Sequence, residues 1–191
     1  MKELVIASNN KGKVKEIKMM MQDINLYSLE DVGFDKEVPE PYDTFNENAH
    51  TKASAVHEYT GKNVFADDSG ICVPALGGAP GVHSAYYAGL PRDNDRNLEK
   101  LIADMADKED RSAYYKAVIC LIWDGEVYYF EGECHGTLVA EKRGTGGFGY
   151  DPIFVPEGYD KTFAELQLEV KNNLSHRGKA VKKMVDFINN R

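Results

Sequence analysis

The stretch that decides the fold reads YYKAVICLIWDGEVYYFEGEC, residues 114–134. Two runs rich in β-branched and aromatic residues, 114–123 and 126–134, flank the dipeptide Asp124-Gly125. That dipeptide suits a two-residue type I′ turn, so the sequence predicts an antiparallel hairpin.

Upstream of the hairpin, short apolar runs alternate with segments of helical periodicity, which is typical of α/β proteins. Thr44, with Glu47 three positions later, forms a capping-box pattern at the start of one such helix. Parallel strands early and a hairpin late predict an α/β fold with a mixed sheet. The predicted strands are 4–7 and 64–66, the latter ending in a turn at 67–70, and the predicted helices are 12–22, 44–59, one capped by Asp93 or Asn94, and one opened by Ser175.

Length and composition narrow the class of protein. The 191 residues suit a single domain spanning 1–191, and the net charge of −8 argues against nonspecific binding to nucleic acid or an anionic membrane. The longest apolar run, 117–123, is too short to span a bilayer, and the N-terminus shows no signal-peptide pattern. Three cysteines without ligand spacing suit a reducing compartment, so we expect buried thiols and a cytoplasmic location.

Two glycine-containing motifs imitate nucleotide-binding fingerprints. Residues 144–149 formally match GxGxxG, but Pro152 follows where a dinucleotide fingerprint needs a helix. Gly12-Lys13 lacks the upstream glycine and the Ser/Thr of a Walker A loop. We therefore expect neither a Rossmann nor a P-loop site.

The segment Ser8-Asn9-Asn10-Lys11-Gly12-Lys13 lies at a predicted strand-to-helix junction. A helix start offers unpaired N–H groups and a positive dipole end, and the two lysines add charge. This combination favours a phosphate-binding site. A capped helix with solvated lysines is the simpler alternative.

Carboxylates gather at a second place, where Asp67 and Asp68 end a predicted buried strand and Glu40 lies on a proline-containing loop. Oxygen ligands of this kind suit Mg²⁺, and a spare carboxylate could deprotonate a water molecule. An Asx-turn is the alternative, and the sequence leaves open whether Asp67 or Asp68 is the base.

A third set could contact a nucleobase. Phe148 could stack on a base, since glycines let the backbone approach a ligand closely, and Arg177 could grip a polar edge or a phosphate. A core aromatic and a structural histidine are the alternatives. The set comprises Phe148, Gly149, Tyr150, Asp151, Lys171, His176 and Arg177. Metal-binding carboxylates, lysines for phosphates and an aromatic loop together predict a nucleoside triphosphate site.

Six motifs in order carry a resemblance: SNNKGK (8–13), ENAxxK (47–52), DDSG (67–70), LGGAPG (76–81), GTGGFGYDP (144–152) and SHRGKA (175–180). With these motifs the chain resembles the inosine triphosphate pyrophosphatase family over almost its entire length. The resemblance implies a two-lobed mixed α/β fold, a nucleotide in a cleft between the lobes, and a homodimer. It also implies Mg²⁺-dependent hydrolysis of ITP, dITP and XTP to the monophosphate and pyrophosphate.

The resemblance also implies roles for individual residues. Asp68 is similar to the family's proton acceptor and metal ligand, with Glu40 as the second metal ligand. Ser69 adjoins the substrate, and Lys52 is a further phosphate contact. The phosphate loop is Ser8, Asn9, Asn10, Lys11, Gly12 and Lys13, and the nucleobase segments are Phe148 to Asp151, Lys171, His176 and Arg177.

Two departures from the family pattern are visible. Many bacterial relatives read Ser-Ala-Arg where this chain has Ser84-Ala85-Tyr86, and the loop at 38–47 is shorter than usual. Three other functions stay open: a pyrophosphatase acting on dTTP or UTP, a nucleotide-binding sensor without hydrolysis, and a purely structural role. A panel of triphosphates with and without a chelator separates them.

Overall fold

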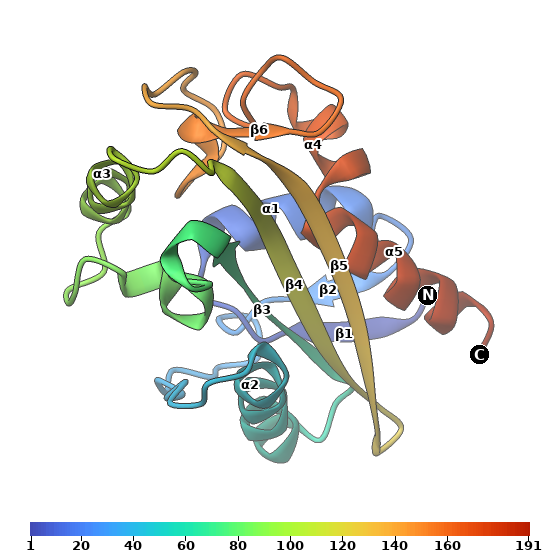
Figure 1. The fold of residues 1–191 in the computed structure, drawn as a ribbon. Helices are drawn as coiled ribbons and strands as arrows, with labels where there is room; N and C mark the ends of the chain where they lie inside the picture. The colour runs from blue at the N-terminus through green and yellow to red at the C-terminus, as the bar shows by residue number, and fades with distance from the viewer. The chain divides into compact units, whose positions relative to one another are not determined.

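Six strands form one mixed β-sheet in the computed structural model, which describes residues 1–191 (Figure 1). Their order across the sheet is β2-β1-β3-β4-β5-β6. β1 pairs in parallel with β2 and β3, whereas β5 and β6 are antiparallel, which confirms the predicted α/β class with a mixed sheet. The strands are β1 (Glu3–Ile6), β2 (Asn25–Tyr27), β3 (Val64–Cys72), β4 (Ser112–Trp123), β5 (Glu126–Leu138) and β6 (Phe154–Pro156).

The predicted helices form within a few residues of the expected bounds. They are α1 (Lys11–Met20), α2 (Phe45–Thr60), α3 (Asn94–Asp104) and α5 (His176–Asn189). The elements not predicted are short, namely β2, β6, α4 (Leu168–Leu174) and the 3₁₀ turns η1 (Pro74–Leu76), η2 (Gly81–Tyr86) and η3 (Asp151–Ile153). Elements of three to seven residues carry too few positions to show periodicity. None of the helices has the length and apolar character that crossing a membrane requires.

Local signals in the sequence account for two of the element boundaries. Thr44 caps α2, and its Oγ1 accepts a hydrogen bond from the backbone N–H of Glu47 at 3.2 Å. Between β4 and β5, Asp124 and Gly125 have φ angles of 50° and 82°. Two consecutive left-handed residues are what a type I′ turn needs, so both the capping box and the hairpin are confirmed.

The predicted end of β3 is wrong. Instead of turning at 67–70, the strand continues to Cys72. Gly70 marks a close approach rather than a turn, because a Cβ there would collide with Gly81 O and Ser84 Oγ of η2. The same Ser84 Oγ accepts a hydrogen bond from the Ile71 N–H at 3.0 Å. Asp67 and Asp68 consequently lie inside a strand, where successive side chains point to opposite faces.

The chain divides into two units, whose boundaries fall inside β3, β4 and β5. Unit 1 comprises 1–68, 117–132 and 177–191, and unit 2 comprises 69–116 and 133–176. In unit 1, one buried cluster joins the strands to α1 and α5, and another joins them to α2. Unit 2 has its own core, with apolar side chains of α3 and the aromatic side chains of Tyr115, Phe154 and Phe163. Each unit therefore has a framework that can hold side chains in fixed positions.

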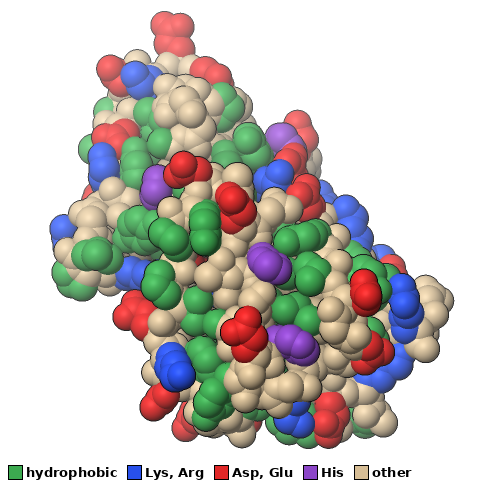
Figure 2. Space-filling view, turned by 90° about the horizontal axis from the view of Figure 1, so that it is seen from below, with side chains coloured by type: hydrophobic (Ala, Val, Ile, Leu, Met, Phe, Trp, Pro, Cys, Tyr) green, Lys and Arg blue, Asp and Glu red, His purple; other side chains and the backbone are tan.

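The cysteines and the surface agree with the sequence-based expectations. Cys72, Cys120 and Cys134 are free thiols and all three are buried. On the face seen in Figure 2, acidic side chains are interspersed with basic and hydrophobic ones, and lysine and arginine form no single continuous patch. The mixture of charges on this face fits the net charge of −8.

Candidate active site

The loop from β1 to α1 builds a cationic helix N-terminus. Asn10 is the N-cap, and its Oδ1 accepts a hydrogen bond from the Lys13 N–H at 3.1 Å. Ser8 Oγ in turn accepts one from the Asn10 N–H at 3.1 Å. The first turn holds no acidic residue, although the helix dipole favours one there, and Lys11 is exposed at its start. The predicted phosphate loop, residues 8–13, thus lies at one helix end with the chemistry of an anion site.

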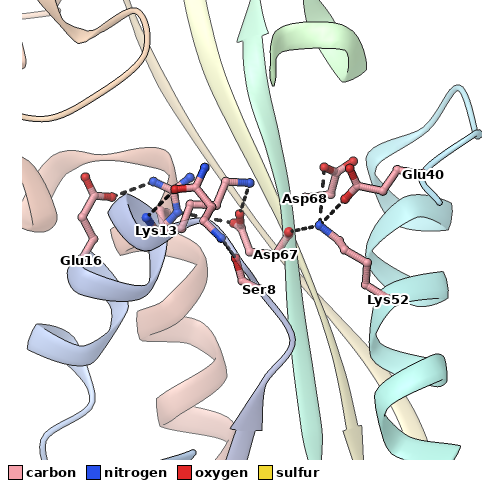
Figure 3. Close-up of polar contacts among 9 residues, drawn as sticks. Ser8, Lys13, Glu16, Glu40, Lys52, Asp67 and Asp68 are labelled. Atoms are coloured by element: carbon pink, nitrogen blue, oxygen red, sulfur yellow. Dashed lines mark hydrogen bonds and ion pairs between the residues drawn. The ribbon is translucent and has the colours of Figure 1, made fainter. Parts of the chain in front are cut away.

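Asp67 and Asp68 point to opposite sides of β3 (Figure 3). Asp67 has no exposed surface and Asp68 is 6% exposed. Because a buried carboxylate is costly unless it is paired, the partners on each side decide what each aspartate can do.

Asp67 belongs to a buried chain of alternating charges. Its Oδ1 lies 2.8 Å from Lys13 Nζ, and its Oδ2 lies 3.6 Å from Arg177 Nε. Arg177 Nη1 donates to Glu16 Oε2 at 2.7 Å. Burial alone would raise the pKa of Asp67, but the charges of Lys13 and Arg177 outweigh it and hold that pKa well below its usual range. Asp67 is therefore a permanent anion whose charge these two cations balance.

Asp68 shares a lysine with Glu40. Lys52 Nζ lies 2.5 Å from Glu40 Oε1 and 3.9 Å from Asp68 Oδ1, and it donates to the Asp67 carbonyl oxygen at 2.7 Å. Asp68 Oδ2 is buried and has no hydrogen-bond partner. Burial, with the nearby charges of Glu40 and Asp67, raises the pKa of Asp68 to about 6 even though Lys52 and Lys13 oppose the shift.

The two adjacent aspartates therefore differ chemically. A carboxyl with a pKa near 6 exchanges protons close to neutral pH, as a general base must, whereas Asp67 stays ionised. Asp67 is committed to two cations while the buried Oδ2 of Asp68 has no partner, so Asp68 is the better candidate for the base, a choice that the sequence left open. Lys13 and Lys52 lie toward different faces of β3 (Figure 3). Burial is the largest cause of the lowered pKa of Lys13, and the positive charge of Lys52 lowers that pKa further. The two ammonium groups therefore interact electrostatically.

In unit 2, Asp151 organises the segment predicted to contact the nucleobase. Its Oδ2 accepts hydrogen bonds from the Phe148 N–H at 3.1 Å and from Lys171 Nζ at 2.6 Å. The ammonium of Lys171 also lies 5.0 Å from the centroid of the Phe148 ring. Ser69, the residue predicted to adjoin the substrate, follows Asp68 on β3 and is half-buried. Tyr150 donates to the Ser84 carbonyl oxygen at 2.6 Å, which fixes the loop that contains Gly149.

His176 and Arg177 are neighbours in sequence but differ in their surroundings. The His176 ring lies nearly parallel to the Tyr115 ring, with centroids 4.6 Å apart. Arg177 is 2% exposed and lies in unit 1 beside Glu16 and Asp67. The structure thus assigns Arg177 a charge-balancing position, and its contact with a nucleobase stays a prediction.

Two residues that contact these groups were not predicted from the sequence. Glu16 pairs with Arg177, which lies 161 positions further along the chain, and Tyr115 donates to Asp151 Oδ1 at 3.0 Å. Glu16 lies three positions after Lys13, on the buried side of α1. A glutamate there breaks the apolar pattern of a buried helix face, and this was the one signal available.

The carboxylates fit a divalent cation of the Mg²⁺ type. No three His, Cys, Asp or Glu side chains cluster as a closed metal site. Mg²⁺ needs no such cluster, since it usually takes one or two carboxylates and completes its shell with water and substrate phosphates. Glu40 and Asp68 supply two carboxylates beside one ammonium, and the buried Asp68 Oδ2 lacks a partner. The donor set therefore suits the predicted ion.

Together, the fold and these groups define an α/β protein with a helix N-terminus whose chemistry suits an anion and two carboxylates whose chemistry suits a divalent ion. The Ham1 family model matches residues 4–187. The dITP/XTP pyrophosphatase of Flavobacterium johnsoniae is 48% identical over 187 residues, which cover 97% of each chain. The chain belongs to the Ham1 family, and the resemblance drawn from the six motifs is confirmed.

Solved structures agree with this assignment. The Staphylococcus aureus Ham1 protein is 40% identical, with a TM-score of 0.89 and 99% of each chain covered. A HAM1 protein from Coxiella burnetii is 35% identical, with a TM-score of 0.90 and full coverage of both chains. Similarity of this extent over the whole length confirms the fold class, while the residue roles given above stay predictions.

Proposed function

We propose that the protein hydrolyses deaminated purine nucleoside triphosphates, namely ITP, dITP and XTP, to the monophosphate and pyrophosphate with the help of Mg²⁺. The observation that carries the proposal is the contrast between the two aspartates of β3. Asp67 is paired with Lys13 and Arg177, whereas Asp68 lies beside Glu40 and Lys52 with its buried Oδ2 unpartnered. Support also comes from the relatives, since the F. johnsoniae protein bears the name dITP/XTP pyrophosphatase.

Asp68 acts as the general base. Its Oδ2 accepts a hydrogen bond from a water molecule and takes the proton as the water oxygen attacks the α-phosphorus. The bond between the α-phosphorus and its bridging oxygen breaks, and pyrophosphate leaves. The monophosphate gains the water oxygen, and the proton passes from Asp68 to solvent.

The triphosphate charge is balanced by the N-terminus of α1 and by the lysines. Lys11 is exposed at the helix start, and Lys52 already lies between two carboxylates. Lys13 is partly committed to Asp67, which orients its ammonium. Electrostatic stabilisation of this kind supplies most of the catalysis in phosphoryl transfer.

Glu40 and Asp68 are the residues that would hold the divalent ion. When bound, such an ion neutralises phosphate oxygens and stabilises the charge that develops on the leaving pyrophosphate. In the absence of the ion, the negative charge of Glu40 helps to raise the pKa of Asp68, and the ammonium of Lys52, which lies near both carboxylates, offsets only part of the shift.

Selectivity against adenine arises at position 6 of the purine, whereas rejection of guanine, which shares the 6-keto group, must come from its 2-amino substituent. Hypoxanthine and xanthine present a keto acceptor there, whereas adenine presents an amino donor. Lys171 and the backbone N–H groups of Gly149 and Tyr150 supply the donors that reward the keto group, since those of Phe148 and Asp151 are bonded within the loop. A donor that faces an amino group is left unpaired. Sites built on such hydrogen bonds reject the wrong group by about 10⁴-fold.

The test is pyrophosphate release from ITP, dITP, XTP, GTP, ATP, dTTP and UTP, with and without EDTA. We expect rapid release from the first three only and none with the chelator. Equal turnover of ATP and ITP would disprove the selectivity, and preference for dTTP or UTP would indicate a pyrimidine enzyme. We also propose a homodimer in the cytoplasm, which light scattering and cell fractionation can check.

A further inference from the structure

Tyr115 lies on β4 in unit 2 and has no part in the function proposed above. It is 7% exposed. Its hydroxyl donates to Asp151 Oδ1 at 3.0 Å, and its ring lies 4.6 Å from the His176 ring at an interplanar angle of 11°. One side chain on a strand thus contacts two of the segments predicted to contact the nucleobase.

The hydroxyl of Tyr115 donates to Oδ1 of Asp151, whereas the other two donors bind Oδ2. The Phe148 N–H and Lys171 Nζ both donate to Oδ2. Without the bond to Oδ1, only Oδ2 of the carboxylate is held, so its rotation about the Cβ–Cγ bond is less restricted and the position of Lys171 becomes less defined. Gly147 has no Cβ that would separate it from this carboxylate, so the loop backbone lies directly against Asp151.

The ring of Tyr115 fixes the start of α5 in the same way. It is nearly parallel to both the His176 and the Phe163 rings and meets the Phe154 ring edge-on at 4.7 Å. Stacked and edge-on aromatic pairs have preferred geometries and restrict each other's motion. The four rings therefore keep His176 in one orientation relative to β4.

We propose that Tyr115 is a positioning residue for purine recognition: its hydroxyl sets the rotation of Asp151, and its ring sets the orientation of His176. The inference rests on the proposed function, because it assigns Tyr115 to the nucleobase part of that same site. The groups proposed to bind the phosphates are the 8–13 loop and Lys52, whereas Tyr115 contacts Asp151 and the His176 ring, so we expect a change at Tyr115 to act on the base and to leave pyrophosphate binding unchanged.

The test compares Tyr115→Phe with Tyr87→Phe. Tyr87 is a matched control, since it also donates its hydroxyl to a carboxylate in unit 2, Asp104 Oδ2 at 2.5 Å, and is not part of the site. For Tyr115→Phe we expect the KM for ITP to rise about 10-fold, near the lower end for loss of one hydrogen bond to a charged group, with kcat within about two-fold. The preference for ITP over ATP should fall by a similar factor, and Tyr87→Phe should change none of these values.

Binding measurements separate this inference from the proposed function. Calorimetry with IMP reports the nucleobase part of the site, and calorimetry with pyrophosphate reports the phosphate part, both without turnover. Weaker IMP binding with unchanged pyrophosphate binding in Tyr115→Phe supports the inference, even if the wild type releases no pyrophosphate and the proposed reaction is wrong. Unchanged KM, selectivity and IMP binding would overturn it while leaving the reaction intact, and so would equal losses in Tyr87→Phe. A wild type that neither binds IMP nor hydrolyses ITP overturns both.

Discussion

Replacing Asp68 with asparagine is expected to stabilise the metal-free protein at pH 8 while removing its activity. The reason is that the surroundings of Asp68 in the folded protein disfavour its ionised form. Burial and the charges of Glu40 and Asp67 raise its pKa from 3.8 to about 6. Ionising Asp68 above pH 6 therefore costs free energy in the folded state that the unfolded chain does not lose.

The expected gain in unfolding free energy follows from the change in the pKa of Asp68. A shift of about two pKa units at about 1.4 kcal/mol per unit gives at most ~3 kcal/mol of unfolding free energy at pH 8. Since the folded-state pKa is raised, the stabilising contribution of protonated Asp68 is fully present below pH 3.8 and is lost as the pH rises through about 6. The difference between Asp68→Asn and wild type should therefore be near zero at pH 4 and largest at pH 8.

The assay is urea unfolding at several pH values in EDTA, because a bound divalent ion would stabilise the folded wild type and mask the effect. Asp67→Asn is the matched control on the neighbouring residue. It removes the anion that Lys13 and Arg177 share, so we expect a loss of about 3–5 kcal/mol at pH 8. Because the pKa of Asp67 is lowered, its stabilising contribution should disappear as the pH falls below about 4.

Opposite signs for the two variants are the expected result. If Asp68→Asn destabilises the metal-free protein at pH 8 as Asp67→Asn does, the reasoning about Asp68 is refuted. Turnover gives a second check, because loss of a general base should lower kcat by at least about 10²-fold. Near-normal turnover in Asp68→Asn would remove Asp68 from the catalytic step.

Three further outcomes test the framework around the site. Thr44→Ala removes the cap of α2 and should lower the unfolding free energy by about 1 kcal/mol in urea titrations, while Thr44→Ser should restore it. Gly70→Ala places a methyl group against the Gly81 carbonyl, so a fall in the thermal midpoint of several degrees is expected, and an unchanged midpoint would contradict the contact. Glu16→Gln weakens the buried partner of Arg177 and should cost about 2 kcal/mol with little dependence on salt, which urea titrations at low and high salt can measure.

The parts of the fold that local chemistry determines were predictable from the sequence. The hairpin at Asp124-Gly125 and the cap at Thr44 depend on residues adjacent in the chain, and both formed as expected. β3 was not predictable in the same way, because Gly70 resembles a turn residue in sequence. Its actual role is contact with η2, more than ten residues further on, and only the folded chain shows it.

The candidate site likewise has a part that local sequence determines and a part that depends on residues distant in the chain. Residues 8–13 were identifiable because a helix end with lysines is a local pattern, and they lie together as predicted. The pairing of Glu16 with Arg177 and of Tyr115 with Asp151 joins residues that are distant in the chain and of ordinary types, so no spacing rule points to them. The sequence also could not separate Asp67 from Asp68, because their difference comes from the alternation of a strand that was predicted to end before them.

That alternation also makes the Asp68 experiment interpretable. Lys52 donates to the backbone carbonyl of Asp67 at 2.7 Å and lies 2.5 Å from Glu40, whereas its distance of 3.9 Å to Asp68 Oδ1 is the longest of the three. The ammonium should therefore keep its position when Asp68 becomes asparagine, so the variant changes the charge at one carboxyl without moving its neighbours. A change in stability with the expected dependence on pH then reports the electrostatics of Asp68 itself, the property on which the proposed catalytic role depends.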